Sequence, residues 1–168
     1  MTALIRIDRL ASPDANGPGP VRFCARCAHV EDAPVGLAPE RRVCPGCQMG
    51  LMLACGPHAL PDAGAAFLVA TAELRVSAVS AAGEAVLGPE RSLVGTKLLE
   101  LLTSPIGNDA LAAAVARAAE GSGEPALLPV RLAYDGAPPH GTMAARIAPC
   151  WPPRAALVTV EPTAFGWR

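Results

Sequence analysis

From residue 65 onward, short apolar segments have the length and the pattern of β-strands. Some are continuous apolar runs, which are typical of buried strands, and others alternate apolar with polar residues. Within residues 142–148, for example, Met143, Ala145 and Ile147 share one face, and Arg146 lies on the other. We predict five antiparallel strands, at residues 66–70, 75–80, 128–134, 142–148 and 155–160, and the first two form a hairpin.

Helical patterns separate this hairpin from the last three strands. In the longest of them, Leu111, Val115 and Ala118 fall on one helical face. Asn108 has the side chain of a good N-cap, and Gly121 is a typical helix end. The predicted helices are 81–87, one or two turns within 92–102 interrupted at Gly95, and the helix from 108 to 121.

The stretches 67–76, 79–88 and 93–101 resemble the PAS family. PAS sequences typically contain, in this order, an apolar strand, a short acidic turn, a second strand and a helix that ends in Leu-Gly, here Leu87 and Gly88. A Leu-x-Gly-x-x-Leu-x-x-Leu segment follows, here residues 93–101, and one departure is Ser80, where many members have Asn. The resemblance covers about 65–163 and implies an α+β fold, with a five-stranded antiparallel sheet and helices on one face.

The resemblance implies a domain that senses a small ligand, binds a partner protein or dimerises. Flavin-binding members with a reactive cysteine carry it near 97–102, and haem-binding members commonly use a histidine on or near the long helix. Neither residue is present there, so we expect no flavin and no haem. We expect His140 to be solvated in a loop and Cys150 to lie in a proline-rich turn.

Four cysteines nearer the N-terminus carry the clearest chemistry. Cys24, Cys27, Cys44 and Cys47 form the pattern C-x2-C-x16-C-x2-C, which is typical of a four-cysteine zinc site. Two thiolates on each tight turn bind one side of a tetrahedral ion, and four thiolates leave no position open for water. The segment resembles a zinc ribbon, and we predict one structural zinc ion per chain.

Other interpretations fit these cysteines less well. Two disulfides fit poorly with a reducing compartment, and a thioredoxin-like motif needs a strand and a helix around each pair. A rubredoxin-like iron site is the main alternative, although such sites are surrounded by aromatic residues and this segment offers only Phe23. Ala28 and Gln48 stand where glycine is common, Cys55 is expected to be a small buried residue, and His29 is expected on the surface.

Composition divides the chain into four segments. We predict a flexible arm at 1–20, a zinc ribbon at 21–55, a linker at 56–64 and the PAS-like domain at 65–163, which we expect to fold without the ribbon. Of the 168 residues, 51% are hydrophobic and 17% are charged, so the chain is not of the disordered class. The single lysine, among many Arg, Ala, Gly and Pro residues, indicates a GC-rich, bacterial genome.

Function is predicted partly by exclusion. The N-terminus does not read as a signal peptide and no apolar run is long enough to span a membrane, so we expect a cytoplasmic protein without membrane contact. The sequence has no phosphate loop, nucleophile elbow or recognisable pair of carboxylates, which indicates that the protein is not an enzyme. We expect a sensory or regulatory protein whose ribbon docks an unidentified protein partner.

Two further functions remain open. A nucleic-acid-binding transcriptional regulator could act through the ribbon, and an iron site would suit electron transfer. The net charge of −1 provides no overall attraction for nucleic acid, but the ribbon is locally basic. Its charged residues are Arg22, Arg26, Arg41 and Arg42, offset by Glu31, Asp32 and Glu40.

A homodimer is the expected assembly. If helices cover only one face of the sheet, apolar residues such as Val76, Val130, Leu132 and Ile147 would form an exposed patch on the other. A twofold contact commonly buries such a patch. The ribbon could instead fold back over this face within one chain.

Overall fold

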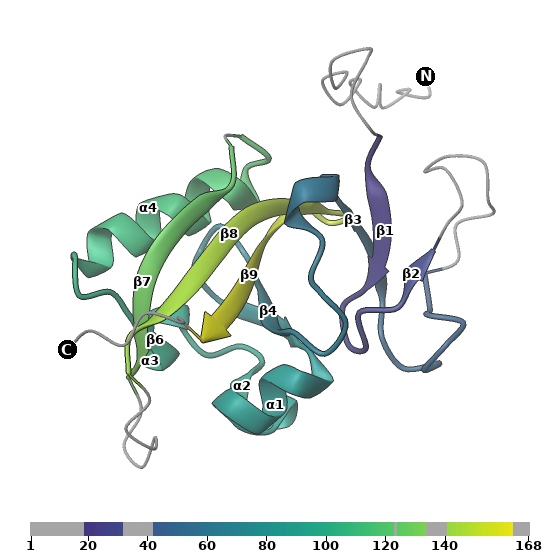
Figure 1. The fold of residues 1–168 in the computed structure, drawn as a ribbon, viewed down its shortest axis with the longest axis horizontal. Helices are drawn as coiled ribbons and strands as arrows, with labels where there is room; N and C mark the ends of the chain where they lie inside the picture. The colour runs from purple at the N-terminus through teal and green to yellow at the C-terminus, as the bar shows by residue number, and fades with distance from the viewer. Residues whose placement is uncertain (1–18, 32–41, 123, 134–140, 163–168) are drawn as a thin grey trace, which may run out of the picture.

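The computed structural model of the chain describes residues 19–31, 42–122, 124–133 and 141–162. These residues form an α+β fold in which an antiparallel sheet curls into a half-barrel and is accompanied by a few helices (Figure 1). The strands are β1 (Val21–Cys24), β2 (Val30–Glu31), β3 (Met52–Cys55), β4 (Ala66–Ala70), β5 (Val76–Val79), β6 (Leu102–Thr103), β7 (Ala126–Leu132), β8 (Met143–Trp151) and β9 (Ala155–Pro162). The helices are the 3-10 helix η1 (Pro57–Ala59), α1 (Ala81–Leu87), α2 (Glu90–Leu93), α3 (Leu98–Leu101) and α4 (Asn108–Ala119).

Seven strands follow one another across the sheet in the order β2-β1-β3-β8-β9-β4-β5. The strands β7 and β6 lie off this path, because β7 pairs with the first half of β8 and β6 pairs with β7. The strands β4, β5, β7, β8 and β9 confirm the five strands predicted from the apolar pattern. The expectation for Cys150 is wrong, since this residue lies inside β8 and the turn comes only after Trp151.

Strand β8 joins the two segments that the sequence suggested were separate domains. Along one edge of β8, Met143 to Ile147 pair with β7, where Val130 is opposite Met143 and Ala126 is opposite Ile147, and β9 pairs along the other edge. Beyond the end of β7, the same edge of β8 pairs with β3, where Cys55 is opposite Cys150 and Ala54 is opposite Trp151. Backbone hydrogen bonding therefore continues from the cysteine-rich segment into the larger sheet.

Local sequence sets the ends of the helices. The side chain of Ser80 is the N-cap of α1 and accepts a hydrogen bond from the backbone N–H of Gly83, and Gly88 ends this helix. The prediction that Asn108 caps the longest helix is wrong. Gly107 is the N-cap, and the Asn108 side chain instead accepts a hydrogen bond from the backbone N–H of Ser104.

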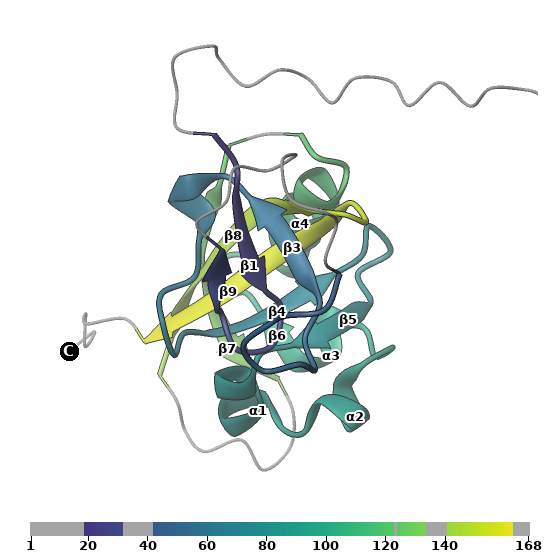
Figure 2. The same ribbon diagram turned by 90° about the vertical axis from the view of Figure 1, so that its right-hand side faces the viewer.

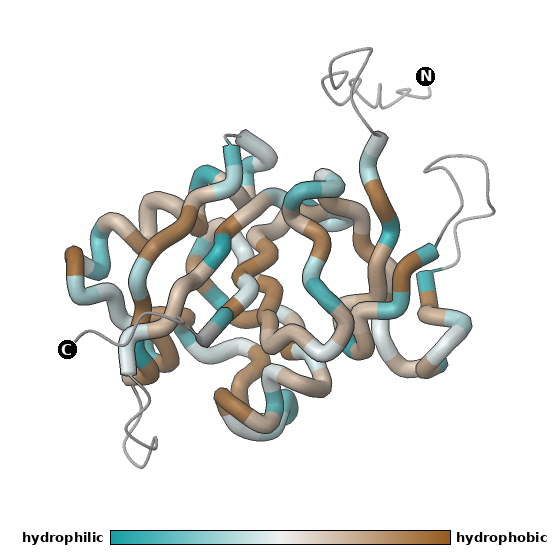
Figure 3. Tube along the Cα trace, in the orientation of Figure 1, coloured by the Kyte–Doolittle hydropathy of each residue, from teal (hydrophilic) through white to brown (hydrophobic). Residues whose placement is uncertain are grey.

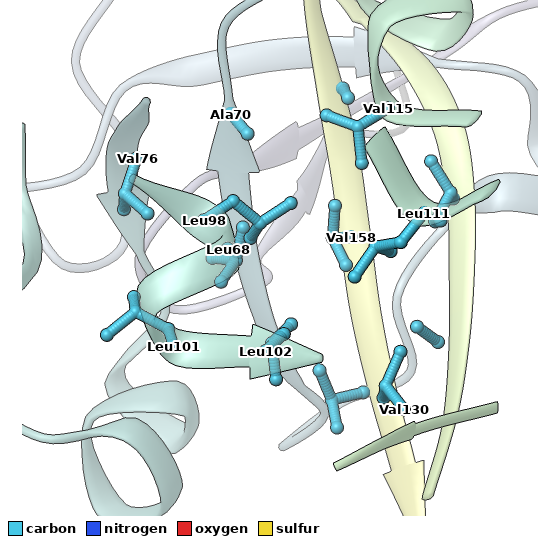
Figure 4. Packing of buried hydrophobic residues seen from close by; sticks show 14 of the residues in the cluster. Leu68, Ala70, Val76, Leu98, Leu101, Leu102, Leu111, Val115, Val130 and Val158 are labelled. Atoms are coloured by element: carbon cyan, nitrogen blue, oxygen red, sulfur yellow. The ribbon is translucent and has the colours of Figure 1, made fainter. Parts of the chain in front are cut away.

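The main hydrophobic core lies between the sheet and the helices. Leu98 of α3 lies against Leu68 of β4, and Leu111 of α4 faces Val158 of β9 (Figure 4). Val76, Val130 and Ile147 are buried in this core, and Leu132 packs against it. The expectation that these four residues form an exposed patch is therefore wrong, because they face the helices.

The ribbon covers part of the opposite face of the sheet. Phe23 of β1 and Leu53 of β3 pack in a second buried cluster with Phe67 and Leu157, which alternate along β4 and β9 with residues of the main core. The rings of Phe23 and Phe67 meet edge to face, with centroids 5.9 Å apart. Figure 2 shows β1 and β3 in front of β4, β8 and β9, and Figure 3 shows that hydrophobic stretches recur in the strands on both sides of this contact. This cover is the one that the sequence left open as an alternative to a dimer contact.

The predicted linker is attached to the sheet. Its η1 helix buries Ala59, and the guanidinium group of Arg146 in β8 donates a hydrogen bond of 2.8 Å to the backbone oxygen of His58. A second nitrogen of Arg146 binds the carboxylate of Glu161 at 2.8 Å. The segment between the ribbon and β4 therefore follows a fixed path over β8. The predicted arm at 1–20, apart from its last two residues, and His140 lie outside the described residues.

Candidate metal centre

Strand pairing brings the two cysteine turns together. Strands β1 and β3 are antiparallel, with Cys24 opposite Met52. The first turn follows β1, and the second lies between Val43 and Leu51, which form an isolated bridge just before β3. The backbone N–H of Ala25 donates to the oxygen of Leu51 at 2.8 Å, so the two turns are also bonded directly to each other.

The four thiols gather around one point. The sulfur atoms of Cys24, Cys27, Cys44 and Cys47 all lie within 4.8 Å of one another. The distance between the sulfurs of Cys24 and Cys47 is 3.7 Å, and that between Cys27 and Cys44 is 3.8 Å. Zn–S bonds of about 2.3 Å in a tetrahedron place the sulfurs about 3.8 Å apart. The cluster therefore has the dimensions of a tetrahedral four-thiolate site, and all four cysteines are free of disulfides.

Backbone N–H groups point at the sulfur atoms from both turns. Cys24 accepts from the N–H groups of Arg26 and Cys27 at 3.3 and 3.4 Å. Cys44 accepts from Gly46, and Cys47 accepts from Gly50, each at 3.3 Å. These donors stabilise the thiolate form of the cysteines, and the thiolate is the form that binds a metal ion.

The two turns have the same backbone shape. Ala28 and Gln48 each follow the second cysteine of a pair, and both have positive φ, at 59° and 56°. Their N–H groups donate to the oxygens of Cys24 and Cys44 at 3.1 and 3.0 Å. This left-handed conformation explains why glycine is common at these positions, since a side chain there is strained.

Gly50 is a part of the site that the sequence analysis did not identify. A Cβ atom at this position would collide with the sulfur of Cys24 and with the Cβ of Arg26. The glycine therefore lets the second turn approach the first cysteine pair closely. Met52 packs against Cys24 and Cys44 from the buried side. The signal in the sequence was the place of Gly50, three residues after Cys47.

The protonation of the thiols depends on their burial. In the chain without metal, burial raises the pKa of Cys24 to about 12 and also raises the pKa of Cys27. The N–H groups of Met49 and Gly50 lower the pKa of Cys47 to about 6. A metal ion must replace the protons of the buried thiols, so binding releases protons and weakens as the pH falls.

The remaining cysteines and the nearby histidine do not join this cluster. Cys55 is fully buried, as predicted, and His29 is exposed beside Gly46. Cys55 and Cys150 lie opposite each other on β3 and β8, and burial raises the pKa of each thiol to about 12. These two thiols stay protonated at neutral pH and pack as small apolar side chains.

Arg26 connects the first cysteine turn to the helical part of the fold. Its guanidinium group binds the carboxylates of Glu84 at 3.1 Å and Glu90 at 2.9 Å. The backbone oxygen of Arg26 accepts from the N–H of Ala81, at the start of α1, at 2.7 Å. These partners are about 60 residues away in the sequence, so no local pattern predicts the contact.

Comparisons with known proteins provide no family for this chain. No protein-family model, curated protein or solved structure matches it. The predicted resemblance to the PAS family therefore has no support from a family match. None of the helices in the described part of the chain is long and apolar enough to cross a bilayer.

Proposed function

We propose that the protein is a non-enzymatic, cytoplasmic regulatory protein that is stabilised by one zinc ion and acts by binding. The observation that carries this proposal is the closed cluster of four sulfurs, which lie within 4.8 Å of one another. Four thiolates complete a tetrahedral site and leave no position for a substrate or a reactive water. The metal then serves to hold the two turns and the strands that follow them. Zinc is favoured over iron because the hydrophobic cluster that the described residues form around the sulfurs consists of Met52 and the cysteines, without an aromatic residue.

A PAS-like interpretation of the larger segment supports a sensory or assembly role. Its elements follow the order hairpin, short helices, longer helix and three antiparallel strands, and α1 to α4 pack on one face of the sheet. Ser80 stands at the point where many family members have Asn, and here it caps α1. A homodimer remains part of the proposal, although the apolar residues that first suggested it face the helices.

A nucleic-acid-binding regulator is the second candidate, and the ion pairs of the ribbon disfavour it. Arg22 binds Glu31 at 3.0 Å, and Arg26 binds two carboxylates. Two of the four arginines that make this segment basic are therefore paired within the chain. Phosphate contacts would have to replace these ion pairs.

Native mass spectrometry and a gel shift test the proposal together. We expect one zinc ion per chain and a colourless protein, and we expect no shift of single- or double-stranded DNA or RNA at 50 or 200 mM salt. A red protein with charge-transfer absorption would contradict the zinc assignment. A shift that is strong at low salt and weak at high salt would favour the nucleic-acid alternative. The same mass spectra report whether the chain is a homodimer.

A further inference from the structure

A groove lies where the two cysteine turns meet the face of the sheet that is turned away from the helices. One wall consists of the turn residues at 25–26 and 49–51, and the other includes Val69 of β4 and Ala78 of β5. Pro153 and Ala155 also line the groove. The groove has a volume of about 550 Å³, which is within the range of about 300–1,000 Å³ typical of small-molecule sites.

The lining of the groove is mostly apolar, and two large apolar side chains at its rim are exposed to solvent. Leu53, Val69 and Ala155 are buried at its base. At the rim, Met49 is 71% exposed and Leu51 is 55% exposed, and both belong to the second cysteine turn. Large apolar side chains that border a groove and remain in water are typical of ligand sites, and methionine adapts easily to the shape of a ligand.

The polar groups in the groove are Arg26, Ser77 and Glu90. The hydroxyl of Ser77 donates to the backbone oxygen of Val69 at 3.1 Å, so its remaining capacity is to accept hydrogen bonds. Glu90 accepts from the N–H of Val79 at 3.1 Å and from Arg26 at 2.9 Å, and a carboxylate has about four acceptor positions. Both groups can therefore accept a further hydrogen bond from a ligand.

The charges around Arg26 and Glu90 favour a positively charged ligand. Arg26 contributes one positive charge, and it is bound to the two carboxylates of Glu84 and Glu90. This group of three side chains has a net charge of −1. An ammonium group provides donors for the free acceptor positions and balances the charge, whereas a carboxylate would meet like charge.

We propose that this groove binds a small molecule with an apolar body and an amine head. The apolar body packs between the second cysteine turn and the sheet, and the amine lies against Glu90 and Ser77. The wall of the groove depends on the metal centre, because Gly50 touches both the groove and the sulfur of Cys24. The role of this ligand as a signal rests on the proposed regulatory function. Binding of a probe to the groove does not depend on that function.

The test is a titration of the full, zinc-loaded chain with 2-phenylethylamine, followed by NMR of the methionine methyl groups. We expect a saturable shift of the Met49 methyl signal. We also expect 3-phenylpropionate, which has the same ring with a carboxylate, to bind at least tenfold more weakly. No shift of Met49 at 10 mM amine, or equal binding of the acid, would overturn the proposal. Either result would leave the metal content and oligomeric state predicted above unaffected.

Two variants test the location of the site. Ala78→Phe places a ring in the groove and should abolish amine binding, whereas Leu127→Phe adds the same ring at a position on β7 that is 67% exposed and outside the groove. If Ala78→Phe does not fold, Met49→Ser removes an exposed side chain of the groove and should weaken amine binding at least threefold; because this variant lacks the Met49 methyl signal, its affinity is compared with wild type by isothermal titration calorimetry. Wild-type affinity in a folded Ala78→Phe variant, or in Met49→Ser, would show that the amine binds elsewhere.

Discussion

Replacing Phe23 by Ala tests whether the ribbon and the sheet form one cooperative structure. Phe23 belongs to the cysteine-rich segment, is fully buried, and packs on Phe67 of β4 with ring centroids 5.9 Å apart. If the two segments were independent, the substitution would destabilise only the ribbon. Because the second core cluster contains residues of both segments, we expect Phe23→Ala to destabilise the whole chain.

The size of the effect follows from the burial of the ring. Truncation of a buried Phe to Ala costs about 3–5 kcal/mol in the free energy of unfolding. For a chain of 168 residues this corresponds to a fall in melting temperature of roughly 6–20 °C. In a double-mutant cycle with Phe67→Ala, the coupling between the two rings should be about 0.5–1.5 kcal/mol.

Urea unfolding at a fixed excess of zinc provides the assay. In a Trp167→Phe background, the fluorescence of Trp151 reports the junction of β8 with β3. Amide hydrogen exchange in α4 reports the far side of the main core. We expect both probes to show the same loss of stability in Phe23→Ala. The control variant is Ile106→Ala, a truncation at a position that is 61% exposed, and it should change the free energy of unfolding by less than about 0.5 kcal/mol. Unchanged exchange in α4, with early release of zinc, would refute the shared core and support the independent domain expected from the sequence.

Three further substitutions have expected outcomes. Cys44→Ser removes one of the four proposed ligands, so it should reduce the zinc content from one ion per chain to near zero and lower the stability of the whole chain. A normal zinc content by mass spectrometry would contradict the assignment of Cys44 as a zinc ligand. Ser80→Ala should lower the free energy of unfolding by about 2 kcal/mol, because the hydroxyl accepts from the N–H groups of Phe67 and Gly83 and is buried; Ser92→Ala, at an exposed helical position, is the control. Thr159→Val should raise the free energy of unfolding by about 1 kcal/mol, since the buried Thr159 hydroxyl has no hydrogen-bond partner among the described residues; a loss of stability in urea unfolding would indicate a partner such as a bound water.

The four-cysteine cluster and most elements of the larger segment followed from local sequence. The spacing of Cys24, Cys27, Cys44 and Cys47 identified the cluster, because two tight turns and one tetrahedral ion leave little choice of arrangement. The strands from 66 to 160 and the helix α1 followed from apolar periodicity and from glycine, which act over a few residues. Asn108 was misjudged as the N-cap because both Gly107 and Asn108 are common at helix starts, and the backbone N–H of Ser104 decides where its side chain binds.

What the tertiary structure decided is how the segments meet. Pairing of β3 with β8, burial of Phe23 against Phe67, and the ion pairs of Arg26 all join residues that are more than 40 positions apart. Such contacts leave no periodic pattern in the sequence, since each depends on the path of the chain between them. For the same reason, alternation predicted that Ile147 and Arg146 lie on opposite faces, but not which face the helices would cover. The sequence by itself determined the four-cysteine pattern and the local elements, and the packing of the ribbon on the sheet determined that they form one structure with a groove between them.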